Sequence, residues 1–326
     1  MRVAIAGFGF RGKEWLDACR RGRVEVVGAA DPSAEARAAA AQRGLRTWES
    51  LEDALADPWD AVILASPEHL HTEDIRRCLR AGRPSLVEKP MTRSWGDAVD
   101  VAREADERGV PVLVGQQMRY IRREVVLRRL LAAGVVGRPV RVTVASTNTR
   151  RDFRREVRDG IWHFTVHYWD AFRTRFGRPP DSIHARDLPE ISSGSAFAAS
   201  LVWEGGPEIS YVHHDGTDPI GYHEWIGCET GSLVVLRERV YVDRRGRRPR
   251  RIWWPRTVDP EAPLLRGLEA AVAGRPPADL GSLDNLQTIA MVEATVRSMD
   301  SGRPVRVPDL LGEASEGPRA EHHPGA

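Results

Sequence analysis

One lysine and two histidines are the side chains of this sequence best suited to move protons. Of the 48 basic Lys and Arg residues, only Lys13 and Lys89 are lysines. Because arginine stays protonated near neutral pH, an amine that exchanges a proton must be one of these two. Lys89 stands in the tripeptide Glu88-Lys89-Pro90, directly after the run 85–87, which predicts the C-terminal end of a parallel strand. A solvated lysine that merely follows the strand is the alternative.

His163, His167 and Asp170 form a second candidate group. Residues 162–176 have the pattern of a helix, which brings positions i, i+4 and i+7 to one face. Imidazole can give or take a proton, which makes His163 and His167 candidate catalytic residues. Asp170 either binds a substrate hydroxyl or makes an internal hydrogen bond that holds the helix, since a buried acid needs a partner in both cases.

The same histidine pair has the spacing of a metal site. Further histidines follow later in the chain, at His213, His214 and His223. The sequence places no third ligand, however, and lacks the glutamate of a metallopeptidase motif. We therefore expect no metal.

A glycine-rich turn lies near the N-terminus. The apolar run 3–6 leads directly into Gly7-Phe8-Gly9-Phe10-Arg11-Gly12, and a helix is predicted from about Lys13. Glycines at this spacing allow a tight turn and close approach of the backbone to a pyrophosphate, which the helix N-terminus then stabilises. The overlapping P-loop pattern fails, because Glu14 stands where Ser or Thr would hold magnesium. The turn predicts a dinucleotide site.

Asp31 ends the second predicted strand, 19 positions after Gly12. An acid near this spacing binds the ribose hydroxyls and repels a 2′-phosphate, which predicts NAD rather than NADP. The alternative is a plain helix cap before Pro32.

The pattern of apolar runs predicts an α/β chain of two domains. Residues 1–118 alternate short apolar strands with helices, with Ser50 and Ser94 as helix caps, and predict a doubly wound parallel Rossmann sheet. Residues 119–311 predict an α/β domain with a large, mostly antiparallel open sheet. Residues 312–326 lack apolar periodicity, so we expect a disordered tail. The predicted strands are 3–6, 24–30, 45–48, 61–65, 85–88, 110–115, 138–149, 196–203, 208–213, 222–227, 232–236 and 239–242.

Composition excludes several classes of protein. The formal net charge is +2, which offers no global field for nucleic acid. We find no run of 18 apolar residues, so no membrane segment is expected. The three cysteines are too far apart for a disulfide framework, and the N-terminus lacks the pattern of a signal peptide. We expect a cytoplasmic protein.

These motifs together resemble the glucose–fructose oxidoreductase / inositol dehydrogenase (Gfo/Idh/MocA) family over nearly the whole chain, to about Leu311. The resemblance rests on the glycine turn, Ser66-Pro67-x-x-x-His71, Glu88-Lys89-Pro90, the segment 114–120 and Gly160-x-x-His163-x-x-x-His167-x-x-Asp170. It implies Lys89 and His167 as catalytic residues, and oligomerisation, as a dimer or tetramer, through the open sheet.

Motifs and resemblance together give two sets of expected binding residues. The cofactor contacts are Gly7, Gly9, Phe10, Arg11, Gly12, Asp31, Ser66, Pro67, His71, Glu88, Lys89 and Gln116. The substrate contacts are Arg119, Tyr120, Trp162, His163, His167 and Asp170.

The sequence departs from the family at His163, where aspartate is usual. Neutral histidine supplies no negative charge, which leaves three interpretations: a different substrate specificity, Lys89 acting without the acid, or hydride chemistry that is lost or redirected. Our hypothesis is that His163 binds substrate while Lys89 and His167 carry the proton. The resulting prediction is hydride transfer between NAD and a secondary hydroxyl or ketone of a sugar or polyol. The alternatives are a glycoside hydrolase that uses NAD for transient oxidation, and a non-catalytic NAD-binding sugar sensor.

Overall fold

The computed structural model describes residues 1–148, 157–188, 196–215, 221–253 and 259–316. These residues form two compact units. The first unit comprises Met1–Arg129, Trp162–Arg175 and Trp253–Ile289, and the second comprises the remaining segments. The segment that carries His163 and His167 therefore belongs to the same unit as Lys89.

The first unit is built on a six-stranded parallel sheet with the strand order β3-β2-β1-β4-β5-β6. Its strands are β1 (Arg2–Ala6), β2 (Glu25–Ala30), β3 (Arg46–Trp48), β4 (Ala61–Leu64), β5 (Ser85–Glu88) and β6 (Val112–Gly115). Strand order reverses at β1, which pairs with β2 on one side and β4 on the other. In a doubly wound sheet the ligand crevice opens at the carboxyl ends of the strands at this point.

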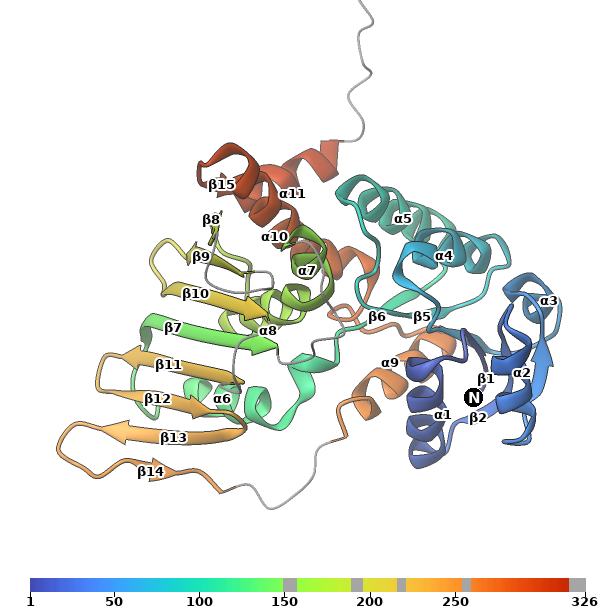
Figure 1. The fold of residues 1–326 in the computed structure, drawn as a ribbon, viewed down its shortest axis with the longest axis horizontal. Coiled ribbons are helices and arrows are strands. Elements are labelled where there is room, and N and C mark those ends of the chain that lie inside the picture. The colour runs from blue at the N-terminus through green and yellow to red at the C-terminus, as the bar shows by residue number, and fades with distance from the viewer. Residues whose placement is uncertain (149–156, 189–195, 216–220, 254–258, 317–326) are drawn as a thin grey trace, which may run out of the picture. The chain divides into compact units, whose positions relative to one another are not determined.

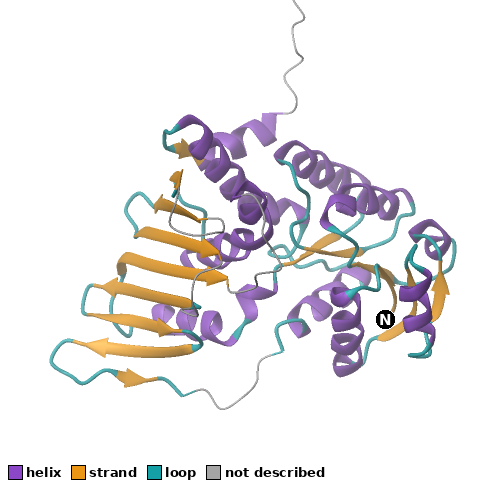
Figure 2. Cartoon of the chain, viewed as in Figure 1, coloured by secondary structure: helices purple, strands orange, loops and turns teal. Residues whose placement is uncertain are grey.

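Helices alternate with these strands, as Figures 1 and 2 show. They are α1 (Phe10–Gly22), α2 (Ala34–Ala41), α3 (Leu51–Leu55), α4 (His71–Arg80), α5 (Trp95–Arg108) and α9 (Ala262–Val272), with short 3₁₀ turns η1 (Glu68–Leu70) and η2 (Gln117–Tyr120). The predicted caps are present, because Ser50 accepts a hydrogen bond from the Asp53 N–H and Ser94 one from the Asp97 N–H.

Successive residues of β1 point to opposite faces of the sheet, as the period of two requires. Val3 and Ile5 join a core with Trp15 and Leu16 of α1 and several leucines of α9. Ala4 instead packs in a second cluster, with Trp48 and Trp59. The continuous apolar run at the N-terminus is thus explained by burial on both faces.

The second unit contains a nine-stranded sheet with the order β14-β13-β12-β11-β7-β10-β9-β8-β15. All pairs are antiparallel except β10 with β7. The strands are β7 (Pro139–Asn148), β8 (Ser182–Asp187), β9 (Ala196–Val202), β10 (Glu208–Asp215), β11 (Tyr222–Cys228), β12 (Gly231–Leu236), β13 (Arg239–Arg244), β14 (Arg250–Arg251) and β15 (Val305–Arg306).

One face of this sheet is open. In β7, Val142 and Val144 are buried, whereas Arg141 and Thr143 are exposed. In β11, Ile226 is buried and Trp225 is 43% exposed. The predicted fold class, a doubly wound parallel sheet followed by a large and mostly antiparallel open sheet, is confirmed.

The remaining helices are α6 (Arg122–Ala132), α7 (Val157–Gly160), α8 (Val166–Phe176), α10 (Ser282–Ser301) and α11 (Val307–Glu316). Two details correct the sequence analysis. Residues 161–165 form a π-helical turn before α8, so the predicted helix over 162–176 is not uniformly α-helical. Residues 312–316, which we placed in the tail, belong to α11, while 317–326 lie outside the described residues.

Candidate active site at the carboxyl edge of the Rossmann sheet

The glycine turn after β1 has the geometry of a pyrophosphate cradle. Gly7 has φ +84°, and a Cβ there would lie 2.6 Å from the Ala65 carbonyl oxygen. A Cβ on Gly12 would lie 2.1 Å from the Gly7 carbonyl oxygen, so α1 packs against the turn only because position 12 is glycine. A Cβ on Gly9 would meet no atom within 4 Å. The turn is therefore closed by Gly7 and Gly12 and open at Gly9, which fits the approach of a dinucleotide.

Helix α1 begins directly at this opening. Its N-cap is Gly9, which has no side chain to cap the first turn. The first N–H groups of a helix lack partners within the helix and carry partial positive charge, so they favour an anion. Phe10 is 67% exposed beside them.

Arg11 and Glu88 are paired rather than pointed at solvent. The Glu88 Oε1 accepts hydrogen bonds from Arg11 Nε at 2.9 Å and Nη2 at 2.5 Å, and from Trp15 Nε1 at 2.7 Å. Arg11 also pairs with Glu14. Burial opposes the charge on Arg11, but the two carboxylates outweigh it and raise its pKa. This cluster ties the end of β5 to the glycine turn, so we assign both residues to positioning rather than to direct cofactor contact.

The Asp31 carboxylate holds the turn from the end of β2. Its Oδ2 accepts from the Phe8 N–H at 2.7 Å and its Oδ1 from the Ser33 N–H at 2.8 Å. The side chain that caps α2 is Ser33, which accepts from the Ala36 N–H. Asp31 is therefore not the side-chain cap of α2, and the helix-cap alternative is wrong.

Lys89 follows β5 and reaches the segment that carries the histidines. Its Nζ donates a hydrogen bond of 2.7 Å to the carbonyl oxygen of His163. That carbonyl belongs to the π-helical turn 161–165, and π turns leave backbone oxygens with irregular partners and are frequent at functional sites. The structure thus brings Lys89 and His163 together.

Glu68 is a site residue that the sequence analysis missed. Its Oε2 lies 3.0 Å from His163 Nδ1, and its side chain is 14% exposed. Glu68 is one of the unspecified positions in Ser66-Pro67-x-x-x-His71. Its place between the two matched ends of that motif was the one feature of the sequence that could have marked it as a candidate site residue. The carboxylate supplies the negative charge that His163 itself lacks.

His167 is partly buried. Its Nδ1 atom is not accessible to solvent and has no hydrogen-bond partner among the described residues. Burial, and then the charges of Lys89 and His163, lower its pKa well below 6.5. The imidazole is therefore neutral at physiological pH and able to accept a proton. Trp162, beside this group in sequence, is buried at 8% exposure, and Tyr120 is half-buried against the Rossmann core.

Asp170 and Arg119 form a buried ion pair. Arg119 donates from Nε to Asp170 Oδ2 at 2.8 Å and from Nη2 to Oδ1 at 2.5 Å. Thr288 and Arg173 also donate to Asp170 Oδ1. Burial alone would raise the pKa of Asp170, but the two arginines and these hydrogen bonds lower it.

This pair bears on the predicted substrate contacts. Asp170 is 0% and Arg119 2% exposed, and their polar atoms face each other. The internal hydrogen bond that we weighed for Asp170 is present, and contact of either residue with substrate stays a prediction. The pair holds α8 against the turn η2 that follows β6.

Hydrogen bonds of Ser66 and His71 hold the Ser66–His71 loop in place. The Ser66 Oγ donates to Asp74 Oδ2 at 2.5 Å. The buried His71 ring lies 2.7 Å from the Pro90 carbonyl oxygen through Nδ1 and 3.0 Å from the Ser66 carbonyl oxygen through Nε2. His71 thus joins the Ser66-Pro67 turn to the Lys89-Pro90 turn, which favours a positioning role over direct cofactor contact.

Gln116, directly after β6, is a buried side chain whose hydrogen-bonding groups are unsatisfied. It is 1% exposed, and neither its Oε1 nor its Nε2 has a partner among the described residues. A buried amide without partners is costly, and a bound group that supplies them would remove that cost. Gln116 therefore fits the predicted cofactor edge of the sheet.

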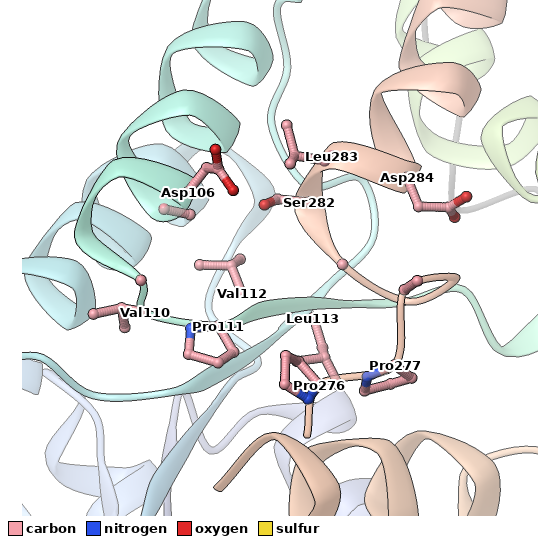
Figure 3. Close-up of a pocket in the computed structure, with 14 residues that line it drawn as sticks. Asp106, Val110, Pro111, Val112, Leu113, Pro276, Pro277, Ser282, Leu283 and Asp284 are labelled. Carbon is pink, nitrogen blue, oxygen red and sulfur yellow. The ribbon is translucent and has the colours of Figure 1, made fainter. Parts of the chain in front are cut away.

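A cavity of about 430 Å³ lies elsewhere in this unit, between the end of α5, the start of β6 and the start of α10. Figure 3 shows it between Pro276 and Pro277 on one side and Ser282 and Leu283 on the other. None of its lining residues belongs to the predicted site. In the described part of the chain no three His, Cys, Asp or Glu side chains are grouped as metal ligands, and no helix is long and apolar enough to cross a membrane.

Comparison with known proteins finds similarity to oxidoreductases. The model of an oxidoreductase family with an NAD-binding Rossmann fold (GFO_IDH_MocA) matches residues 1–116. A 4-carboxy-2-hydroxymuconate-6-semialdehyde dehydrogenase of Sphingobium sp. is 28% identical over 251 residues, 72% of this chain and 79% of that protein. An inositol 2-dehydrogenase of Mycolicibacterium smegmatis is 32% identical over 195 residues, 56% of this chain and 55% of that protein.

The fold is also that of solved oxidoreductases. An oxidoreductase from Agrobacterium radiobacter, solved with NAD+, L-tartaric acid and magnesium, superposes with a TM-score of 0.83. It is 18% identical, and the match covers 95% of this chain and 99% of the other. At this identity the likeness concerns the fold.

Proposed function

Because the chain belongs to the Gfo/Idh/MocA oxidoreductase family, we propose that it is an NAD-dependent dehydrogenase of secondary hydroxyl groups. The proposed reaction is reversible hydride transfer between NAD(H) and a carbon of a sugar, polyol or sugar derivative. The observation that carries it is the meeting of Lys89, His163 and Glu68 at the carboxyl edge of the Rossmann sheet, beside a histidine whose pKa is lowered.

We assign the cofactor to the glycine turn, with Asp31 at its ribose. Gly9 leaves the opening for the pyrophosphate, and the first N–H groups of α1 face an anion there. Asp31 is an acid at the end of β2, which supports NAD over NADP, because a carboxylate repels a 2′-phosphate. When bound, the nicotinamide accepts or gives the hydride.

The hydroxyl proton is assigned to His167 and Lys89. A neutral His167 can take the proton as the alcohol is oxidised and return it in the reverse direction. The Lys89 Nζ is held by the His163 carbonyl, which fixes the position of this amine in the proposed site, and we assign it to the substrate oxygen on which charge develops.

Glu68 and His163 form the acidic partner of this group. The Glu68 carboxylate lies on the His163 ring, so we describe Glu68 as a positioning residue. His163 lies 24% exposed and remains the residue that we assign to substrate. We further propose that residues 119–311 select the substrate and that copies of the chain associate through the open sheet.

The test is NADH absorbance with NAD and a panel of inositols, aldoses, amino sugars and sugar acids. Wild type should form NADH with one class, and Lys89→Met should lose at least ~100-fold of that rate, as expected when a proton-transfer group is removed. Glu68→Gln should lose roughly tenfold, the loss of one charge-assisted hydrogen bond. NAD binding must stay intact in both variants.

Other results would redirect the assignment. Cleavage of a glycoside without net NADH would identify a hydrolase that uses NAD transiently. Tight NAD binding without turnover, and with a protein partner recovered, would identify a sensor. Unchanged turnover in Lys89→Met would refute the proposed chemistry.

A further inference from the structure

The β13–β14 hairpin is an uncommonly basic segment. Residues 244–251 contain six arginines and no acid. The whole chain carries a formal charge of only +2, so the rest of it is net acidic. β14 is the edge strand of its sheet, and Figure 1 shows the hairpin there. Positive charge is thus concentrated on one exposed ribbon.

Five of these arginines, Arg244, Arg245, Arg247, Arg248 and Arg250, form no ion pair within the described ranges. Elsewhere on the same sheet, exposed arginines pair with acids, for example Arg138 with Glu229 at 2.7 Å and Arg141 with Glu208 at 3.1 Å. In the described ranges, the nearest carboxylate lies beyond 4.0 Å from every guanidinium among Arg244, Arg245, Arg247, Arg248 and Arg250. An arginine-rich composition explains their number. It does not explain why these five have no acid, since like charges this close repel one another.

A recess lies under the hairpin. Its volume is about 340 Å³, and its apolar walls are Leu130, Val135, Val242 and Ile252. Its remaining lining is entirely arginine, from Arg244, Arg247, Arg248 and Arg250. All eight residues belong to the second unit.

The strand register explains why charge and apolar surface face the same space. Val242 pairs with Arg250, and directly paired residues project from the same face of a sheet. The Ile252 N–H donates to the Val240 carbonyl, which continues that face. The turn closes with a hydrogen bond from the Arg247 N–H to the Arg244 carbonyl over Gly246, at φ +75°. It returns the chain so that Arg247 and Arg248 line the same recess.

This combination selects a ligand by its chemistry. Four guanidinium groups bind phosphate oxygens in bidentate pairs and need a ligand with several negative charges. Apolar walls add affinity only for a group that leaves water, and about 340 Å³ is within the range of small-molecule sites. A bare phosphate would leave the walls unused, and a nucleic acid backbone would need no recess.

We propose that this recess binds a small organic polyphosphate, with its phosphates on the four arginines and its apolar part against Leu130, Val135, Val242 and Ile252. The site is separate in sequence from every residue of the proposed active site.

The test is isothermal titration calorimetry on the full chain with geranyl diphosphate, which has no nucleoside for the glycine turn. Pyrophosphate and geraniol supply its two halves. Geranyl diphosphate should bind, and each half should bind at least ~10-fold more weakly. The Arg247→Ala/Arg248→Ala variant should lose roughly tenfold in affinity for each arginine, as for charge-assisted hydrogen bonds.

Two further variants make the result specific. Arg247→Lys/Arg248→Lys keeps the positive charge but removes the planar guanidinium groups that bind phosphate in a bidentate manner. Its affinity for geranyl diphosphate should therefore fall between that of wild type and that of the alanine variant. Arg138→Ala/Arg239→Ala removes two exposed arginines of the same sheet that do not line the recess, and should bind as wild type does. Equal binding of pyrophosphate and geranyl diphosphate would overturn the proposal. Absence of binding, or tighter binding to a DNA duplex or to anionic phospholipid vesicles, would overturn it too.

Discussion

Replacing Gly9 by alanine separates cofactor binding at the glycine turn from folding of the turn. In the free chain, a Cβ at this position meets no atom within 4 Å, and its φ of −73° lies outside the left-handed region that favours glycine. The cost is the poorer N-cap of α1, about 1 kcal/mol or less. For a chain of this size that corresponds to a fall in Tm of roughly 2–4 °C.

The bound state should respond differently. A pyrophosphate seated on the turn must approach the Gly9 backbone closely, and a methyl group there displaces it from the first N–H groups of α1. Each charge-assisted hydrogen bond that is lost costs about 1.5–3 kcal/mol. We therefore expect affinity for NADH to fall at least ~10-fold, measured by calorimetry, while the Tm measured without cofactor changes little.

Two other glycines serve as controls. Gly96, in the first turn of α5, also has no atom within 4 Å of a built Cβ, so Gly96→Ala should keep NADH affinity and stabilise the helix by up to ~1 kcal/mol. Gly12→Ala places a Cβ 2.1 Å from the Gly7 carbonyl and should impair folding itself. Wild-type NADH affinity in Gly9→Ala would show that the pyrophosphate does not bind this turn.

Two further predictions concern buried charge. Asp170→Asn leaves Arg119 buried beside a neutral partner and should cost about 3–5 kcal/mol, seen as a fall in Tm of roughly 6–20 °C; a normal Tm with a raised KM would instead return Asp170 to substrate binding. His167 has a lowered pKa in the folded state, so the unfolded chain binds its proton first as pH falls. Stability that is fully present above about pH 6.5 should then decline by up to ~1.4 kcal/mol per pH unit below it, and His167→Gln should reduce that slope in denaturant titrations; an unchanged slope would mean that His167 titrates normally.

Local rules were sufficient to predict the first sheet. Apart from β3 (Arg46–Trp48), each of its strands contains a short apolar run between a helix and a turn, so periodicity and glycine spacing predict it without knowledge of distant residues. Gly7 and Gly12 illustrate this, because the Cβ contacts that exclude other residues involve atoms of the same strand–turn–helix unit or of the adjacent strand end. The missed strands β8, β14 and β15 are different. They are short or carry charged residues, and they are fixed by pairing with neighbours rather than by their own pattern.

The role of Asp170 could not be read from helical spacing. Positions i, i+4 and i+7 place it on the face that carries the histidines, which left a substrate contact and an internal hydrogen bond equally open. Whether a carboxylate on that face can bind a ligand depends on whether another side chain already pairs with it. Arg119, which pairs with Asp170, comes from another element, 51 residues earlier in the chain. The π-helical turn at 161–165 was hidden for a similar reason, since a single extra residue in a turn leaves no mark on the apolar pattern.

His163 shows why a departure from a family pattern has to be judged in space. Position 163 carries a histidine where an acid is usual, so the sequence motif contains no negative charge there. Judged from the motif alone, Lys89 would lack an acidic partner. The carboxylate of Glu68, 95 residues away along the chain, lies 3.0 Å from the ring that replaced the acid. Electrostatic energy depends on the distance between charges and on their burial, not on which segment supplies them. A negative charge is thus present next to the residue that stands in place of the acid. The substitution therefore argues for a changed substrate-facing group on a preserved proton-transfer site rather than for a lost reaction.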